Sequence, residues 1–180
     1  MLAAAEQLFY EEGIGSVGID RIIERAGVAK ASLYDVFGSK DELVRSYLAG
    51  RLERRKARLA ERLARLRTPR ERLLGVFDAL ADFIAEPGFR GCPFVRASTQ
   101  TKDSSSARQV CVESREWTLE LFHELAREAG AAHPKKLARQ LVLLYDGAIT
   151  SAQMDGDSQS AATARAMAAA IVDAEIGARR

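Results

Sequence analysis

The fold of this chain is decided by residues 26–40, which read AGVAKASLYDVFGSK. Four apolar residues lead into this stretch at helical spacing and share one face of a short helix: Ile19, Ile22, Ile23 and Ala26. Gly27 then ends that helix, because glycine readily adopts the left-handed conformation found after helix C-termini, and Val28 can pack back against the end. A second short helix follows at once, so residues 18–37 are predicted to form a helix-turn-helix.

The second helix of this motif has two different faces. Its spacing predicts an inward face made of Ala29, Leu33 and Phe37. The outward face carries small or polar residues: Ala31, Ser32, Tyr34 and Asp35. Such a face can sit deep in the major groove of DNA, and Lys30 and Lys40 at its two ends can meet phosphates. Periodicity alone would equally fit a solvated pair of surface helices in an ordinary helical bundle.

Residues 3–48 as a whole resemble the DNA-binding domain of the tetracycline-repressor (TetR) family of bacterial transcriptional regulators. The matching positions are Ala4-Ala5, Leu8-Phe9, Gly13, Ile22, Ala26-Gly27-Val28, Lys30, Leu33-Tyr34, Phe37 and Ser39-Lys40-Asp41-Glu42-Leu43. The resemblance implies an all-α protein of about nine helices, with a three-helix DNA-binding head at residues 1–46 and an effector-binding and dimerisation body at residues 47–180. It also implies a ligand-responsive transcriptional regulator, which in most members of the family is a repressor.

The outward face and the resemblance together give a set of candidate DNA-contacting residues: Gly18, Lys30, Ala31, Ser32, Tyr34, Asp35 and Lys40. Two of these positions depart from the family pattern. The family usually opens the first helix of the motif with a Thr or Ser pair, whereas this chain has Val17-Gly18, so only backbone N–H groups remain to bind a phosphate there. Asp35 replaces a residue that is commonly aromatic or basic, and its carboxylate either accepts from a cytosine amino group or is held by a neighbour such as Lys40.

Length and composition fit one compact protein with a small head and a larger body. The chain has 180 residues, 47% of them hydrophobic, and a formal net charge of +2. Residues 18–58 hold ten Lys and Arg against six Asp and Glu, so this basic stretch overlaps the expected head. No apolar run approaches the roughly 18 residues needed to span a bilayer, and no secretory signal is visible, so we expect a cytoplasmic protein.

Beyond the head, the sequence predicts helices separated by clear breakers. A long helix should cover residues 40–66, and the next should start with Pro69 in its first turn and end at Pro87-Gly88. Two capping boxes are expected, each pairing a hydroxyl with a glutamate three residues further on: Ser39 with Glu42, and Thr68 with Glu71.

The last two predicted helices, residues 135–154 and 157–176, form a hairpin rich in Leu and Ala. Each carries an apolar stripe that packs on its own body, contacts a second copy, or does both. These stripes are Leu137, Leu141, Leu144, Ala148 and Ala152 on the first helix, and Ala164, Ala168, Ile171 and Val172 on the second. In the resembled family the last two helices pair across a two-fold axis, which implies a homodimer whose two heads bind a palindromic operator in double-stranded DNA.

The resemblance also implies an effector pocket among the middle helices. Candidate lining residues are mostly apolar: Phe77, Leu80, Phe83, Cys92, Phe94, Arg96, Gln100, Trp117, Leu121 and Tyr145. Most of these side chains would serve equally well as plain core. Their apolar bias favours a small organic effector, and the family mechanism implies that its binding shifts the population of head spacings through the long helix that starts at Lys40.

Other classes of protein have less support in the sequence. No nucleophile with a base, no paired acids and no glycine-rich phosphate loop points to an enzyme. Cys92 and Cys111 could form a thiol sensor, although two small buried hydrophobes are the commoner arrangement. The spacing of these cysteines with His123 and His133 matches no zinc site, so no metal and no cofactor are expected. The remaining alternative is a helical small-molecule-binding or thiol-based sensor with weak or lost DNA binding.

Overall fold

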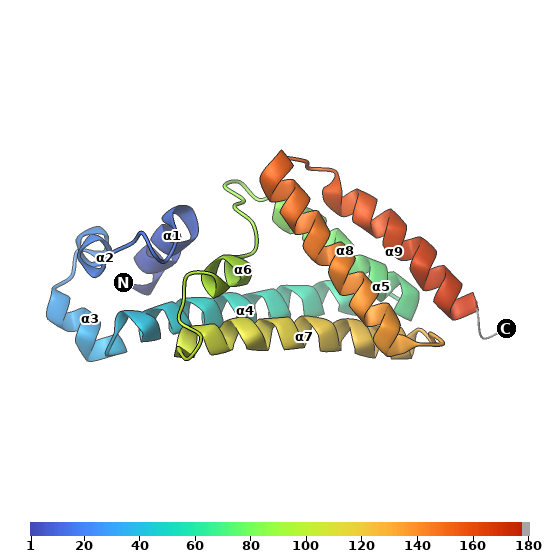
Figure 1. Ribbon diagram of the computed structural model, residues 1–180, viewed down its shortest axis with the longest axis horizontal. Coiled ribbons are helices and arrows are strands. Elements are labelled where there is room, and N and C mark those ends of the chain that lie inside the picture. The colour runs from blue at the N-terminus through green and yellow to red at the C-terminus, as the bar shows by residue number, and fades with distance from the viewer. Residues whose placement is uncertain (178–180) are drawn as a thin grey trace. The chain divides into compact units, whose positions relative to one another are not determined.

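The computed structural model describes residues 1–177, and within that range the chain forms helices joined by turns (Figure 1). The nine helices of these residues are α1 (Leu2–Glu12), α2 (Ile19–Ala26), α3 (Lys30–Phe37), α4 (Lys40–Ala64), α5 (Pro69–Ile84), α6 (Pro93–Ser98), α7 (Ser106–Glu128), α8 (Pro134–Asp155) and α9 (Ser160–Gly177). The predicted all-α fold is confirmed. None of the helices described is long and apolar enough to cross a bilayer.

The helices form two compact units. Within the described residues, the first unit comprises residues 1–55 and 92–114, and the second comprises residues 56–91 and 115–177. The unit that holds the helix-turn-helix is therefore larger than the head expected over residues 1–46, because it also includes α6 and the first part of α7. Two helices, α4 and α7, begin in the first unit and end in the second.

In the first unit, the turn between α2 and α3 follows from Gly27. This residue has φ 64° and ψ 37°, its N–H donates to the Glu24 carbonyl, and the Val28 N–H donates to the Ile23 carbonyl. These two bonds form a Schellman motif, which satisfies carbonyls that the end of a helix would otherwise leave open. The turn therefore has the form that the sequence predicts.

The core of the first unit forms where α2 and α3 meet α1 and the start of α4. Ile22 and Leu33 are fully buried, as are apolar side chains from the two flanking helices: Ala5, Leu8, Phe9, Leu43, Val44, Tyr47 and Leu48. The rings of Phe9 and Tyr47 lie 5.7 Å apart, centroid to centroid. The prediction for Ala29 is wrong, because this residue was expected on the inward face and is exposed. It is the N-cap of α3 and lies outside the helical repeat, so the buried face begins at Leu33.

In the second unit, α5 packs against both α8 and α9, which also pack against each other. The predicted capping box at the start of α5 is complete: Thr68 Oγ1 accepts from the Glu71 N–H, and the Glu71 carboxylate accepts from the Thr68 N–H. Three aromatic rings meet in the core, with centroids 5.7 Å apart for Phe77 and Phe122 and 6.3 Å apart for Phe77 and Tyr145.

Two predicted helix starts differ from the structure. At the start of α4, Ser39 Oγ accepts from the Glu42 N–H, but the Glu42 carboxylate accepts from Arg45 and lies 2.7 Å from Ser106 Oγ rather than closing the expected box. The hairpin between α8 and α9 turns at Gly156, which is left-handed with φ 67°. Asp157 then accepts from the Gln159 N–H and delays the start of α9 to Ser160, three residues later than expected.

Candidate nucleic-acid interface

The outer face of α3 is exposed, as the sequence predicts. Ala31, Ser32, Tyr34 and Asp35 all lie at the surface, with Leu33 buried behind them. Val36 is also exposed, to 68% of its surface, although it is not among the candidate DNA-contacting residues. An isolated valine near the end of a short helix fits an inward position equally well, so its apolar side chain gave no reason to include it.

Two helix N-termini open on this part of the first unit. Gly18 caps α2 and Ala29 caps α3, both in extended conformation, and neither helix receives a side-chain cap. A Cβ at Gly18 would meet no atom within 4 Å, so the approach to the start of α2 is open. Uncapped N–H groups and the positive end of the helix dipole make such termini suitable for phosphate oxygens.

The two lysines of the interface have different environments. Lys30 is exposed and its Nζ lies 2.9 Å from Asp20 Oδ1. Lys40 is partly buried, donates from Nζ to the Ile14 carbonyl at 2.8 Å, and has a pKa lowered by burial. The structure therefore gives Lys40 a part in holding the first unit together, whereas its place beside the recognition helix predicts a phosphate contact. Its observed hydrogen bond is to the backbone and not to Asp35.

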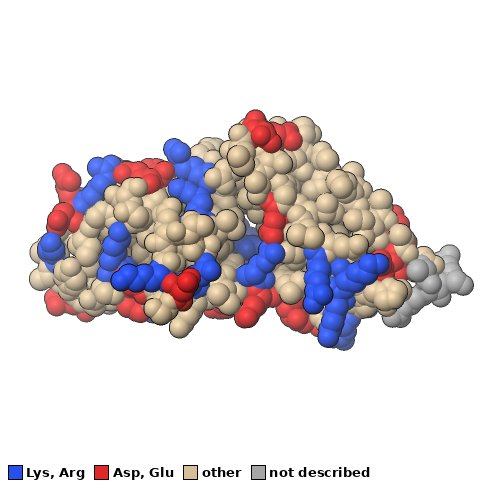
Figure 2. Space-filling model, in the orientation of Figure 1, with Lys and Arg blue, Asp and Glu red and all other residues tan. Residues whose placement is uncertain are grey.

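Charges of both signs are interleaved on the molecule. On the face drawn in Figure 2, Lys and Arg side chains alternate with Asp and Glu rather than forming one uninterrupted basic patch. Within the first unit, Arg21 pairs with Glu12 at 2.6 Å, and Arg54 Nη2 donates to both oxygens of Glu6 at 2.9 Å. The basic surplus of residues 18–58 lies beyond the expected head, since residues 1–46 hold five Lys and Arg against eight Asp and Glu. Specific contacts must therefore supply a larger share of any affinity for DNA.

Two polar residues expected in an effector pocket instead hold α6 against the rest of the first unit. Arg96 donates to the Tyr10 carbonyl at 2.6 Å, and Gln100 Oε1 accepts from the Gly15 N–H at 2.9 Å. With Phe9 and Tyr47 they line a cavity of about 10 Å³, roughly the space of one water molecule. The polar groups of both residues thus bind the backbone of the first unit, and their place in an effector pocket stays a prediction.

The start of α7 is fixed to the start of α4 in the same unit. The Ser106 N–H and hydroxyl both donate to Asp41 Oδ2, at 3.1 and 2.8 Å, and the hydroxyl also lies 2.7 Å from Glu42 Oε1. Asp41 and Glu42 directly follow the end of the helix-turn-helix. The residues after α6 are therefore tied to the helix that follows the recognition helix.

The other pocket candidates fall in both units. Cys92 and Phe94 belong to the first unit, and six lie in the second: Phe77, Leu80, Phe83, Trp117, Leu121 and Tyr145. The structure brings Phe77 and Tyr145 together around Phe122, which the list of candidates omitted. Phe122 stood out in the sequence only as one more apolar residue of a helix.

A thiol-sensor role finds little support at Cys111. Its side chain is buried, and burial raises its pKa to about 11. Since the thiolate is the reactive form, a thiol with this pKa is largely unreactive near neutral pH.

The predicted dimer stripe is corrected by the burial of its members. Of its nine residues, only Leu144 and Ile171 are partly exposed. The other seven are buried within the chain itself: Leu137, Leu141, Ala148, Ala152, Ala164, Ala168 and Val172. Buried side chains pack α8 and α9 onto the second unit and cannot meet a partner.

A different row of residues on these two helices faces outward. It consists of Leu143, Gly147, Thr150 and Met154 on α8, and Thr163, Met167, Ala170 and Ala174 on α9, all exposed. We call this set the outer stripe. On both helices the spacing alternates between four and three residues, as in the seam of a coiled coil. Leu143 and Met154 are 69% and 79% exposed, which is unusual for large apolar side chains at such regular spacing.

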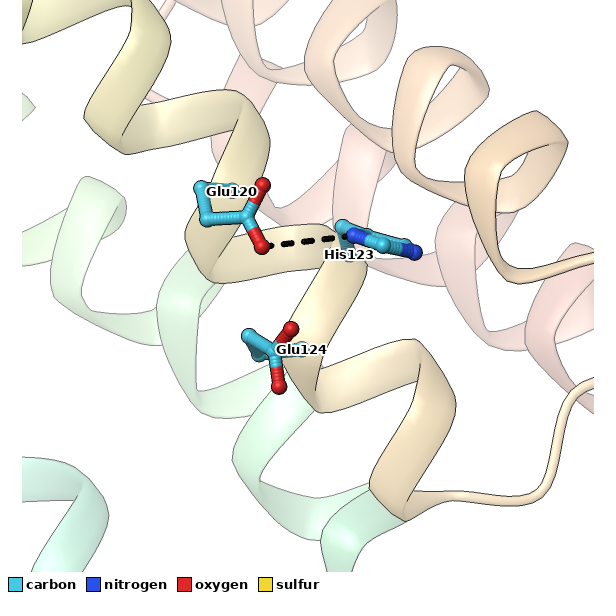
Figure 3. A group of neighbouring side chains, drawn as sticks. All are labelled: Glu120, His123 and Glu124. Atoms are coloured by element: carbon cyan, nitrogen blue, oxygen red, sulfur yellow. Dashed lines mark hydrogen bonds and ion pairs between the residues drawn. The ribbon is translucent and has the colours of Figure 1, made fainter.

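A group of possible metal ligands lies on one turn of α7 (Figure 3). One atom each from Glu120, His123 and Glu124 lie within 4.8 Å of one another, and His123 Nδ1 is 3.4 Å from Glu120 Oε1. Both oxygens of Glu124, however, already accept from Arg127, at 2.9 and 3.0 Å. The group fits a row of surface ion pairs, and its residues offer no reason to invoke a metal.

Comparison with known proteins agrees with this geometry. Residues 1–47 match the family model described as bacterial regulatory proteins, tetR family. The crystal structure of a TetR-type regulator from Streptomyces avermitilis is 32% identical, with a TM-score of 0.83 over 97% of this chain and 94% of that one. A TetR-family regulator from Streptomyces coelicolor is 29% identical, with a TM-score of 0.92 over 97% of this chain and 93% of that one.

A curated relative is also similar in sequence. The HTH-type transcriptional activator FasR of Mycolicibacterium smegmatis is 30% identical over 130 residues, which cover 72% of this chain and 59% of that protein. The chain thus matches about three-fifths of the length of this relative.

Proposed function

Since this chain belongs to the TetR family of bacterial transcriptional regulators, which are not enzymes, we propose that it binds a palindromic operator as a homodimer and is released by a small, mostly apolar effector. The observation that carries the proposal is the helix-turn-helix itself. Its recognition helix, α3, presents a small, polar and exposed face, and the N-termini of α2 and α3 are both open to phosphates.

Homodimerisation follows from the affinity that one such helix can provide. A single short recognition helix makes few base contacts, so two heads on one symmetric body are needed to bind an operator tightly. We assign the contact between copies to the outer stripe, since it is a regular row of exposed residues on α8 and α9, most of them small or apolar. Gly147 lies in its middle, where the missing side chain lets a facing helix approach closely.

The effector is proposed to bind in the second unit, near the cluster of Phe77, Phe122 and Tyr145. Aromatic side chains provide large apolar contact areas for an organic molecule, and a polar tip such as the tyrosine hydroxyl can orient it. Because α4 and α7 each run from one unit into the other, a displacement of either helix would alter both units. Effector binding would then favour a conformation whose head spacing no longer fits the operator.

The direction of regulation is proposed to be repression, as the resemblance implies. FasR, a relative, carries the name of an activator, so the direction has its own test: transcription in vitro from a promoter that contains the selected operator. Added protein lowers transcript yield if it represses and raises it if it activates. As a DNA-binding protein, the molecule is proposed to act in the compartment that holds the chromosome.

The primary experiment is selection of random-sequence duplex DNA by the purified protein at about 0.1 M salt, where electrostatic contacts are screened but still measurable. Enrichment of a palindrome supports an operator-binding dimer. A folded dimer that enriches no sequence would overturn the proposal and would favour the alternative of a helical sensor that no longer binds DNA.

A further inference from the structure

One ion pair joins the two helices of the helix-turn-helix at their starts. Lys30 is the first residue of α3 and Asp20 lies in the first turn of α2. Lys30 Nζ and Asp20 Oδ1 are 2.9 Å apart, and the two side chains are 54% and 82% exposed. The pair therefore lies at the surface, beside Ala31 and Ser32 at the N-terminal end of the recognition helix.

Stability alone does not account for this pair. Exposed ion pairs typically contribute little to folding, about 0–1 kcal/mol, because water already solvates both charges. A carboxylate on a surface that faces phosphates also opposes binding unless a cation neutralises it. With Lys30 beside Asp20 the net charge of the pair is zero, so it adds little to the sequence-independent attraction between protein and DNA.

The free hydrogen-bonding capacity of the pair is complementary to one base pair. An ammonium has three donors and a carboxylate has two acceptor oxygens, so after their mutual bond Lys30 keeps two donors and Asp20 keeps one unbonded oxygen. In the major groove, guanine offers acceptors at O6 and N7, and its partner cytosine offers a donor at N4. Guanine O6 and cytosine N4 bond to each other at about 2.9 Å, the same separation as Lys30 Nζ and Asp20 Oδ1.

We propose that Asp20 and Lys30 act together as a specificity element that recognises one G·C base pair in each half-site. Lys30 donates to guanine O6 and N7, and Asp20 accepts from cytosine N4 while holding the ammonium in place. The N-terminal residues of a recognition helix are those that reach base edges, which is where Lys30 lies. This inference rests on the proposed operator binding. It assigns a base-recognition role to Asp20, and it changes the role of Lys30 from a phosphate contact to a base contact.

The test compares DNA selections by the wild-type protein and three variants. Lys30→Gln and Asp20→Asn each remove one half of the pair with little change in size. Glu12→Gln is the matched control, because it breaks another exposed ion pair of the same unit, with Arg21, and changes the net charge by the same amount as Asp20→Asn. Circular dichroism confirms that each variant is folded, and fluorescence anisotropy measures affinity for the selected site as a function of salt.

The wild-type site is expected to contain a G·C pair at one position of each half. Lys30→Gln and Asp20→Asn should each lose about tenfold or more of the preference for that pair over A·T, since one good base contact is worth about 1–3 kcal/mol. Glu12→Gln should keep the preference.

Two results would overturn the inference. If Asp20→Asn and Glu12→Gln both raise affinity for every sequence and leave the base preference intact, Asp20 is only a surface charge. If Lys30→Gln instead weakens binding to every sequence equally and leaves the base preference intact, Lys30 contacts a phosphate. Both outcomes require a wild-type protein that selects a palindrome, so they differ from failure of the proposed function, in which the wild type selects none.

Discussion

Replacing Gly147 with alanine separates the stability of one chain from the affinity between two. Gly147 is exposed in the middle of α8, and a Cβ built on it meets no atom within 4 Å in its own chain. Within a single chain the added methyl group therefore causes no clash. The greater helix propensity of alanine should instead stabilise the folded chain by up to about 1 kcal/mol.

In the proposed dimer the same methyl group would lie between two helices in contact. Adding a methyl to a well-packed contact typically costs about 1–3 kcal/mol. Because the two-fold axis repeats the substitution in the second chain, the total cost is about 2–6 kcal/mol, which weakens the dimer by roughly thirtyfold or more. The substitution should therefore stabilise the chain and weaken the dimer.

Sedimentation velocity over a series of protein concentrations measures the dissociation constant, and urea unfolding of the dilute protein measures the stability of the chain. Leu143→Gln on the outer stripe should also weaken the dimer. Val112→Gln is the control, since Val112 is an exposed apolar residue of the first unit that lies off the stripe. A Gly147→Ala protein with the dissociation constant of the wild type would refute the assignment of the interface to the outer stripe.

Three further substitutions test the description of the two units. Burial raises the pKa of Tyr47 to about 12, so the folded chain keeps a proton that the unfolded chain loses near pH 10. The free energy of unfolding should therefore fall by roughly 2 kcal/mol between pH 10 and 12, and it should fall less steeply in Tyr47→Phe. Urea unfolding at each pH measures this difference. Thr68→Ala should lower the free energy of unfolding by about 1 kcal/mol and Thr68→Ser should not, and equal losses in the two would argue against the capping box. Arg96→Met removes a charged donor from the Tyr10 carbonyl and should lower the free energy of unfolding by about 1–3 kcal/mol. Amide hydrogen exchange in α6 should become faster, and unchanged exchange there would show that Arg96 does not anchor this helix.

Local signals account for what could be predicted from the sequence. The Gly27 turn and the Thr68 capping box depend on residues within five positions of each other, and both have the predicted form. Buried Leu33 and the exposed residues around it likewise follow from helical spacing, once the helix start is known. Ala29 shows the limit of this reasoning, because a boundary shifted by one residue moves it from the core to the cap.

Contacts between distant residues account for what could not be predicted. Arg96 and Gln100 are 86 and 85 residues away from the backbone groups that they bind, and no local pattern indicates those partners. The prediction of the dimer stripe was wrong for another reason. Helices α8 and α9 carry small or apolar residues around most of their circumference, so periodicity offers several faces, and only the packing on α5 determines which one remains outside.

The contacts of α6 and of the start of α7 bear on how regulators of this kind can be recombined. Residues 92–114 belong to the same compact unit as the helix-turn-helix, and they hold it through Tyr10, Gly15 and Asp41. A chimera that transplants residues 1–46 alone would cut through this unit and leave those groups facing foreign side chains. A transferable DNA-binding module of this protein is discontinuous in sequence, and a graft should carry residues 1–55 together with residues 92–114.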